Sequence, residues 1–516
     1  MGTSYNRRMS TFPAHEWVNT VLPASDGIPM GLLPAWHAAR TPRRAAITEG
    51  DLTVDWTGLE ARANRRARAL QALGVGQDDF VTIALPNSVA FYETAFAVWK
   101  LGAVPNVVSP KLPAAELDAI LELVRPRVLV CLRAAARPGV PVHAVDEPVD
   151  ASLSAEPLPE RVSTYWKALA SGGSTGRPKI IVDHMPSRWD PAAGALGQQA
   201  GWTVLSPGPL YHNAPFSFMH CALFAGCHVI EMGRFDALRA LELIEKHRVQ
   251  WVNFVPTMMH RIWRLPDEQR NAFDLSSLEI VFHMASACPV WLKERWIEWL
   301  GPQRIWELYG GTERQGRTVL SGVEWLQHKG SVGRVSPGAR LVVLDEQGRE
   351  CPPGEIGEIY FLPDTGRNST YHYLGAEARA HGEWESLGDL GHLDADGYLY
   401  LSDRRTDLVI SGGANIYPAE VEAAIDAHPQ VQTSAVIGLP DDDLGQRVHA
   451  IVQPAADALG TDEDALRASI LDFLATRLVR YKIPRSIEFS SEPMRDDAGK
   501  MRRAALRAAR LPRTET

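Results

Sequence analysis

The sequence lacks most features that would indicate a secreted or membrane-bound protein. Cysteine is scarce, with five among 516 residues, and their spacing matches no metal site or disulfide framework: Cys131, Cys221, Cys227, Cys288 and Cys351. No apolar run is long enough to cross a bilayer, and the first 31 residues have no secretory signal pattern. We therefore expect a cytoplasmic protein without a membrane partner.

A large excess of one charge is also missing. Lysine and arginine total 53 against 62 aspartate and glutamate residues, a net charge of -9, and both signs are mixed along the chain. This balance does not favour nucleic acid or an anionic membrane as a partner. The length predicts more than one domain and is ample for a large core.

A run of small, hydroxylated and basic residues at 171–179 predicts a phosphate-binding loop. Its glycines let several backbone N–H groups point at one anion, its hydroxyls can donate, and its lysine adds positive charge. The pattern is not a Walker A loop, because Arg177 and Pro178 separate the last glycine from the lysine. The residues assigned to phosphate are Ser171, Gly172, Gly173, Ser174, Thr175, Gly176 and Lys179.

Two other interpretations of this run remain open. Residues 172–176 also fit the G-x-S-x-G pattern of a hydrolase elbow, in which Ser174 would be a nucleophile between a strand and a helix. Pro178 opposes that helix, because proline spoils helical geometry beyond the first turn. The other interpretation is a flexible surface loop, since glycine and serine clusters are common in flexible segments.

Further motifs follow the loop in a fixed order, and each has residues suited to a nucleotide. Tyr309 can stack on a purine, Thr312 can donate to a phosphate, and Glu313 offers the hard oxygen that Mg²⁺ prefers. Asp389 lies in a turn-rich segment, where its carboxylate can accept hydrogen bonds from ribose hydroxyls. The remaining motifs are at 403–407, 412–422 and 499–500.

From about residue 30 to the end, these motifs resemble the adenylate-forming superfamily of acyl- and aryl-CoA synthetases, adenylation domains and luciferases. The resemblance implies that ATP and Mg²⁺ activate a small carboxylic acid as an acyl-adenylate, with CoA as the second substrate. It is strongest to the bile-acid and steroid-acid CoA ligases, which suggests a hydrophobic, cyclic or polycyclic acid. Coronafacic acid ligases are also similar and imply the alternative of an amine acceptor and an amide product.

The resemblance also assigns roles to individual residues. Lys500 is implied as the catalytic lysine, His212 as a positioner at the substrate carboxylate, and Thr312 as a catalytic donor. The nucleotide site gains Ser286, Ala287, Glu307, Leu308, Tyr309, Gly310, Gly311, Asp389 and Arg404, with Glu313 at the metal. The acyl pocket is expected from Trp202, His212, Phe216, Met219, Phe282 and Met284, and the acceptor tunnel from Gly412, Gly413 and Ala414. A catalytically dead regulator would be expected to have lost Lys500, Glu313 or Asp389, and all are present.

Hydrophobic periodicity predicts an α/β fold. A capping box at Thr57 and Glu60 predicts a helix that ends at Gly74, and residues 80–85 predict a buried strand. Another helix is expected over 237–247 and another strand over 304–308. We expect a large N-terminal domain of parallel and mixed sheets covered by helices (1–402), a hinge (403–407) and a small mobile α+β domain (408–516).

Overall fold

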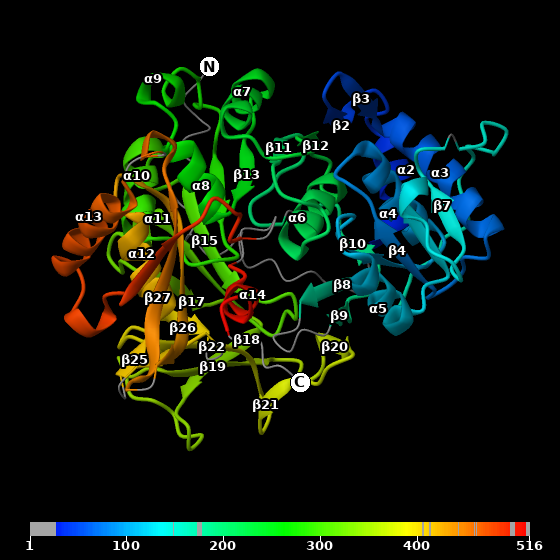
Figure 1. Cartoon of the computed structure of the whole chain (residues 1–516). Helices are drawn as coiled ribbons and strands as arrows, with labels where there is room; N and C mark the ends of the chain where they lie inside the picture. The colour runs from blue at the N-terminus through cyan, green and yellow to red at the C-terminus, as the bar shows by residue number, and fades with distance from the viewer. Residues whose placement is uncertain are drawn as a thin grey trace.

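The computed structural model describes residues 27–511 except 148, 173–177, 194, 405–406, 412–413, 442, 459, 461 and 496–500. It has the predicted α/β class, with two large sheets in the N-terminal part and a smaller α+β unit after them. In Figure 1 the blue and cyan N-terminal elements lie on one side, the orange C-terminal elements lie on the other, and the green sheet lies between them.

The largest sheet has 14 strands within the described residues, in the order β18-β19-β22-β23-β17-β16-β15-β14-β13-β11-β12-β2-β3, with β21 beside β22. Its centre, from β2 to β15, is parallel, and the strands beyond β15 are antiparallel. The strands are β2 (Ala45–Glu49), β3 (Leu52–Asp55), β11 (Thr203–Ser206), β12 (His228–Glu231), β13 (Trp251–Phe254), β14 (Ile280–His283), β15 (Ile305–Gly310), β16 (Arg317–Ser321), β17 (Ser331–Val335), β18 (Ala339–Leu344), β19 (Gly357–Pro363), β21 (Arg379–His381), β22 (Trp384–Leu393) and β23 (Leu399–Arg404).

Helices join the parallel strands and bury their apolar faces against the sheet. The predicted helix over 237–247 is α7, where the Asp236 side chain accepts a hydrogen bond from the Arg239 N–H at 2.9 Å and so caps the first turn. The helices of this region are α6 (Asn213–Phe224), α7 (Ala237–His247), α8 (Pro256–Trp263), α9 (Asp267–Arg270), α10 (Val290–Leu300) and α11 (Gly322–Trp325).

The second sheet runs β20-β9-β8-β5-β4-β6-β7, and a short pair, β1 with β10, lies outside it. Its strands are β4 (Phe80–Ala84), β5 (Val104–Val107), β6 (Val128–Cys131), β7 (Val142–Ala144), β8 (Lys167–Gly172), β9 (Pro178–Asp183) and β20 (Tyr371–Leu374), and the pair is β1 (Ile28–Pro29) and β10 (Arg188–Trp189). The helices here are α2 (Leu33–Ala38), α3 (Trp56–Ala72), α4 (Val89–Lys100) and α5 (Ala114–Val124).

The predicted cap of α3 is wrong. The helix begins at Trp56 and not after Thr57, because Asp55 is the N-cap and its carboxylate accepts the Gly58 N–H at 2.7 Å. An aspartate is at least as good a cap as threonine, and Asp55, the last residue of β3, lies two residues before Thr57.

The C-terminal unit has its own apolar core between a three-stranded sheet and two helices. Its elements are β24 (Val409–Ser411), β25 (Ala414–Ile416), α12 (Pro418–Asp426), β26 (Val431–Asp441), β27 (Gly445–Pro454), α13 (Glu463–Ala475), β28 (Ser486–Phe489) and α14 (Arg503–Ala508). Short 3₁₀ turns complete the described chain: η1 (Met30–Leu32), η2 (Arg133–Ala135), η3 (Ala456–Ala458) and η4 (Arg480–Lys482).

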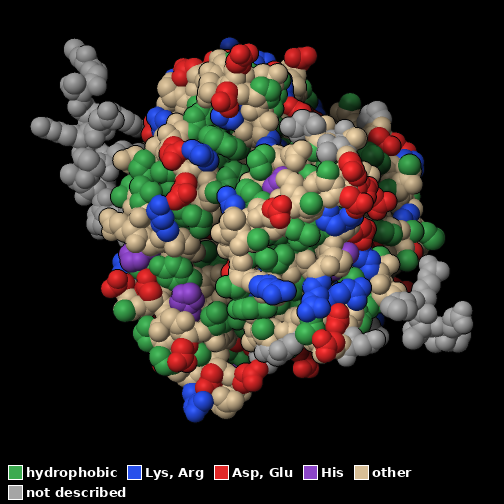
Figure 2. All heavy atoms as spheres, turned by 60° about the vertical axis from the view of Figure 1, so that its left-hand side comes forward, with side chains coloured by type: hydrophobic (Ala, Val, Ile, Leu, Met, Phe, Trp, Pro, Cys, Tyr) green, Lys and Arg blue, Asp and Glu red, His purple; other side chains and the backbone are tan. Residues whose placement is uncertain are grey.

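The surface agrees with the mixed charges of the sequence. On the face in Figure 2, acidic, basic and apolar side chains are interspersed. None of the helices in the described part of the chain combines the length and apolar character needed to cross a membrane.

Candidate active site

The predicted nucleotide motif begins where the parallel part of the large sheet ends. β15 pairs in parallel with β14 and antiparallel with β16, so the residues that follow Gly310 leave the sheet at a change of strand direction. Ligands in open α/β sheets bind outside the carboxyl ends of the parallel strands, and Gly310 is at that end of β15. The Tyr309 hydroxyl donates to Asp389 Oδ2 at 2.8 Å, which brings the motifs around these two residues together.

Glu313 lies at the other end of this motif and is held by the second sheet. Its carboxylate is 6% exposed and accepts a hydrogen bond from the Tyr373 hydroxyl at 2.7 Å. Lys179 Nζ lies 3.5 Å from the same oxygen, Oε1, and 4.1 Å from the centre of the Tyr373 ring. Burial, and next the nearby Glu313 charge, raise the pKa of Tyr373 well above its usual value, so this phenol stays a donor.

The Gly310-Gly311 pair provides room beside Glu313. A Cβ atom on Gly311 would lie 2.7 Å from Glu313 Oε2 and 2.7 Å from Leu387 Cδ1. Real Cβ atoms do not approach other heavy atoms so closely, so both neighbours would have to move. Glycine at this position therefore keeps the second carboxylate oxygen of Glu313 in place.

Glu307 is buried in an ion pair and also lines the cleft described below. Lys293 Nζ lies 2.5 Å from Glu307 Oε2, and His283 Nδ1 lies 3.8 Å from Oε1. Burial raises the pKa of Glu307, while the lysine opposes that effect. Burial also lowers the pKa of His283 well below its usual value, so the imidazole is neutral.

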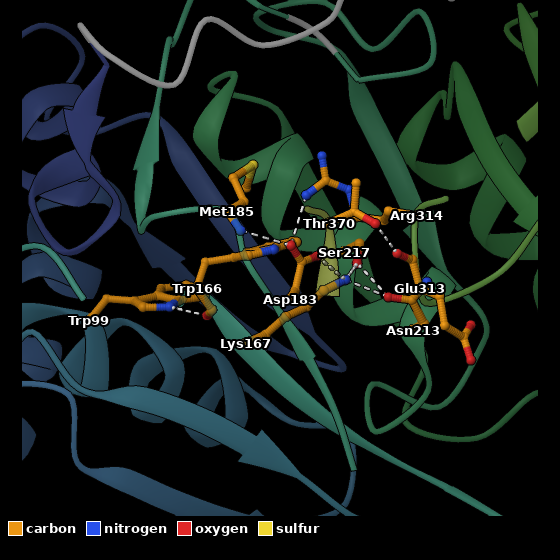
Figure 3. A network of polar contacts seen from close by, with 10 residues as sticks. All are labelled: Trp99, Trp166, Lys167, Asp183, Met185, Asn213, Ser217, Glu313, Arg314 and Thr370. Carbon is orange, nitrogen blue, oxygen red and sulfur yellow. Dashed lines mark hydrogen bonds and ion pairs between the residues drawn. The ribbon is translucent and has the colours of Figure 1, made fainter. Parts of the chain in front are cut away.

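A buried polar network that the sequence analysis missed surrounds Lys167 (Figure 3). The ammonium group, 1% exposed as a residue, contacts Asn213 Oδ1, donates to Ser217 Oγ at 2.6 Å and lies 3.8 Å from Asp183 Oδ2. Arg314 donates to the other oxygen of Asp183 at 2.8 Å. Burial lowers the pKa of Lys167 to about 8. One sequence feature could have indicated this network: Lys167 is a lysine at the start of the apolar run that precedes the glycine loop.

One cleft of about 3030 Å³ collects most of the predicted site residues. His212 is the N-cap residue of α6 and lines this cleft with its ring 4.9 Å from that of Tyr211. The other predicted residues along its wall are Lys179, Met284, Ser286, Ala287, Glu307, Leu308, Tyr309, Gly310, Gly311, Thr312, Glu313 and Asp389.

The glycine-rich run connects two antiparallel strands. β8 pairs with β9, with Gly172 opposite Pro178, and residues 173–177 between them lie outside the described residues. This connection excludes the hydrolase elbow at Ser174, because the strand β9 stands where an elbow requires a helix. Only the backbone of Ser171 and Gly172 is described, at the end of β8.

Four of the residues expected in the acyl pocket belong to the core instead. Phe216, Met219 and Phe282 are almost fully buried in the main hydrophobic cluster, and Trp202 packs against that cluster. α6 turns its Phe216 and Met219 side inward, while Asn213 and Ser217 line the cleft. The helical period alone could not tell which face meets the core and which meets the cavity.

Several predicted residues cannot be placed. Lys500, Gly412 and Gly413 lie outside the described residues, and only the backbone of Arg404 is described, at the end of β23. Ala414 begins β25, which forms a short antiparallel pair with β24. The segment that follows Lys500 reaches the cleft, since Arg502 and Arg503 line it.

Comparison with known proteins gives matches over nearly the whole chain. A family model described as AMP-binding enzyme matches residues 34–362, and one described as AMP-binding enzyme C-terminal domain matches residues 420–500. Feruloyl-CoA synthase from an Amycolatopsis species is 33% identical over 504 residues, which cover 93% of this chain and 98% of that protein.

Solved structures also match nearly the whole chain. The o-succinylbenzoate CoA synthetase of Bacillus subtilis, solved with its acyl-adenylate intermediate, is 26% identical with a TM-score of 0.77 and covers 92% of this chain and 97% of that one. An amide bond synthetase from Marinactinospora thermotolerans has the same TM-score at 23% identity, covers 94% of this chain and 100% of that one, and shares the fold.

Proposed function

Because the chain belongs to the AMP-binding enzyme family and is an ATP-dependent, AMP-forming ligase, we propose that it activates a hydrophobic, cyclic or polycyclic carboxylic acid as an acyl-adenylate and transfers the acyl group to CoA. The observation that carries this proposal is the meeting of distant motifs in one cleft. The Tyr309–Asp389 and Glu313–Lys179 contacts join segments from both large sheets around a single space.

The first step joins the acid to AMP. A carboxylate oxygen of the acid attacks the α-phosphorus of ATP, and the bond from that phosphorus to pyrophosphate breaks. Tyr309 offers a ring for adenine, Asp389 an acceptor for ribose, and Thr312 and Lys179 donors for the phosphates. Two anions must approach each other in this step, so positive charge in the cleft has to offset their repulsion.

Lys500 is the residue we assign to that task. It lies outside the described residues, but Arg502 and Arg503, just after it, line the cleft. We propose that its ammonium bridges the acid carboxylate and the α-phosphate. The 171–179 loop, Ser286, Ala287 and Arg404 complete the proposed nucleotide site.

The donors at Glu313 suit a magnesium ion. Its carboxylate is a hard oxygen ligand, and Tyr373 and Lys179 both contact Oε1, which leaves Oε2 beside the glycine pair. Magnesium, when bound, would neutralise phosphate charge. Glu313 would hold it, and Tyr373 and Lys179 would fix the carboxylate in position.

The other part of the cleft suits a hydrophobic acid. Its wall there includes the apolar side chains of Met185, Trp189, Leu196 and Phe218. Flat, apolar substrates gain most from such surfaces. The names of the feruloyl and o-succinylbenzoate enzymes describe ring-bearing acids, which supports the same class here. His212, at the start of α6, is proposed to position the carboxylate.

The second step requires the acceptor to reach the acyl carbon. The thiol sulfur of CoA would attack that carbon, and the carbon–oxygen bond to AMP would break. We propose that the unit after 403–407 rotates about this segment, withdraws Lys500 and brings Gly412, Gly413 and Ala414 to the site as an acceptor tunnel. An amine acceptor, which would give an amide, is the alternative.

Carboxylate-dependent ATP–pyrophosphate exchange tests the proposal. The acids should include linear aliphatic, aryl and polycyclic members, and CoA or an amine is then added separately to the best one. We expect exchange with ring-bearing acids and a thioester with CoA. An amide without a thioester would replace CoA by the amine, and no exchange with any acid would refute the adenylation proposal.

A further inference from the structure

The motif after β15 ends in a tight turn whose last residue is strained. The Arg314 N–H donates to the Gly311 carbonyl oxygen at 3.3 Å, which closes a β-turn with Thr312 and Glu313 at its centre. Arg314 itself has a φ of 57°, in the left-handed region. A residue with a Cβ atom is strained there, and such strain persists only where other contacts hold the backbone.

The Arg314 side chain supplies such a contact by binding a carboxylate of the second sheet. Its Nη1 donates to Asp183 Oδ1 at 2.8 Å, and Asp183 is the last residue of β9. The arginine side chain is 43% exposed, but that of Asp183 is only 1% exposed. Burial opposes the charge of Asp183, yet Arg314 and then Lys167 outweigh it and hold the pKa of Asp183 below its usual value. The ion pair therefore joins the turn to a buried charge.

The strand beside β9 holds the other side of the turn. The Thr370 hydroxyl donates to the Glu313 carbonyl oxygen at 2.8 Å, and the Tyr373 hydroxyl donates to Oε1 of the same residue at 2.7 Å. β20 carries Tyr373 and pairs with β9, which ends in Asp183. In Figure 3, dashed lines mark the Arg314–Asp183 and Thr370–Glu313 contacts. One pair of strands thus fixes the turn from two sides.

We propose that Arg314 is a positioning residue for the nucleotide phosphates and their metal ion. Through its ion pair with Asp183 it keeps Thr312 and Glu313 in the cleft wall that they line. The inference rests on the proposed function, which gives these two residues the phosphate and Mg²⁺ contacts, and adds the side chain that orders them. Without the ion pair the strained turn has other conformations open to it, and both contacts lose their fixed geometry.

The test starts from Arg314→Asn, which removes the ion pair but suits the backbone, because asparagine tolerates the left-handed region. Calorimetry measures the binding of ATP with Mg²⁺ and with a chelator, both without an acid so that no turnover occurs. Arg314→Asn should weaken Mg·ATP binding by about tenfold and metal-free ATP binding by about twofold or less. Arg314→Lys keeps the charge but not the planar donor group, and should lose about threefold.

Asp183→Asn shows whether Arg314 acts through the ion pair. This variant should weaken Mg·ATP binding by a similar factor, and combining it with Arg314→Asn should cause no further loss, since both changes remove one interaction. A guanidinium that contacted a phosphate directly would give additive losses instead. Thermal unfolding of each variant shows that it is folded, and Arg314→Lys serves where a neutral variant is not.

Arg248→Asn is the matched control. Arg248 also has a left-handed φ, of 51°, and its Nη1 lies 2.6 Å from Asp274 Oδ2. It follows α7 as the C-cap residue, and the described residues that line the cleft do not include it. Losing this ion pair should leave both kinds of ATP binding unchanged.

Four results would overturn the inference while leaving adenylation intact. They are unchanged Mg·ATP binding in Arg314→Asn, an equal loss for metal-free ATP, additive losses in the double variant, or a comparable loss in Arg248→Asn. An equal loss with and without metal would mean that the guanidinium contacts the nucleotide itself. Failure of the proposed function is distinguishable, because no acid would then support pyrophosphate exchange by the wild type.

Discussion

At the scale of single residues, the site depends on carboxylates whose surroundings give them different tasks. Glu313 faces a lysine and a phenol at its Oε1 atom, while Glu307 is committed to Lys293. Both glutamates are buried and lie on β15 or just after it. Of the two, Glu313 has a carboxylate oxygen, Oε2, beside Gly311. We therefore propose Glu313 as the metal ligand, while Glu307 pairs with Lys293.

Replacing Glu313 by glutamine should reduce exchange activity by about 100-fold or more and raise the Mg²⁺ concentration needed for half-maximal rate. Glutamine keeps an acceptor for Tyr373, so the thermal unfolding temperature should change little. Glu294→Gln, which alters a partly exposed partner of Lys329 at the surface, is the control. Unchanged magnesium dependence in Glu313→Gln would contradict the assignment.

The carboxyl group of Asp426 makes the stability of the fold depend on pH. Burial raises the pKa of Asp426, in α12, from 3.8 to about 7, although the positive charge of Arg495 opposes the shift. Between about pH 4 and 7 the folded protein therefore keeps a proton that the unfolded chain has released. Stability falls as the pH rises through this window, by at most about 1.4 kcal/mol per pH unit, and the loss is complete above it.

Asp426→Asn should remove this dependence. The asparagine oxygen can still accept from the Ser434 hydroxyl, which donates to Asp426 at 2.7 Å. The unfolding temperature of the variant should exceed that of the wild type by an amount that grows from pH 4 to 7 and then stays constant. Calorimetry across this range measures it, with the exposed Asp472→Asn as control; a constant difference at every pH would contradict the prediction.

At the scale of elements, the end of β15 sets the shape of the nucleotide site. The strand stays in register with β16 through Gly310, opposite Arg317, and the chain then turns at Gly311 toward β9 and β20. The switch from parallel to antiparallel neighbours opens space above this end. A side chain in that space would push on Glu313 and Leu387 together.

Gly311→Ala should therefore lower kcat/KM for exchange by about tenfold or more while the protein remains folded, because relieving the clash moves Glu313. Gly76→Ala is a suitable control, since the nearest atom to its added Cβ, Asp79 Oδ2, lies 3.9 Å away. Exchange kinetics and thermal unfolding should be measured together. Full activity in Gly311→Ala would contradict the prediction, because the added Cβ would contact both Glu313 and Leu387.

At the scale of the whole molecule, one arginine joins the C-terminal unit to the large sheet domain. Arg264, just after α8, donates to the carbonyl oxygens of Pro429 and Val431 at 2.7 and 2.6 Å and to that of His428 at 3.3 Å. His428 and Pro429 lie in the turn between α12 and β26, and Val431 is the first residue of β26. This contact stabilises the domain arrangement seen here.

Arg264→Ala should reduce the population of this arrangement by about tenfold. The substitution removes a charged donor from the sheet domain and takes its hydrogen bonds from three carbonyl oxygens of the C-terminal unit. Distance measurements between spin labels, one on each domain, should show the change as a broader or shifted distribution. Arg261→Ala is the matched control, since Arg261 lies on α8, three residues before Arg264, and is exposed. An unaltered distribution in Arg264→Ala would contradict the role of this residue.

Elements whose signals are local were predictable. The helix over 237–247 and the strand starting at Phe80 follow from their apolar spacing, and β15 only extends the strand expected over 304–308 to Gly310. The cap at Thr57 was predicted wrongly, because Asp55 competes for the same helix end and the choice depends on where β3 stops. Periodicity gives an element and its apolar face, but its last residue depends on its neighbours.

The sequence by itself determined the fold class, the family and the order of the motifs, because these depend on residue types and spacings that persist along the chain. The tertiary structure alone decided which of them meet. Phe216 and Asn213 share one helix, yet the first is in the core and the second faces the cleft. Lys167 finds its partners 46 and 50 residues away in sequence. Such contacts depend on how sheets and helices pack, and no local pattern of side chains encodes that packing.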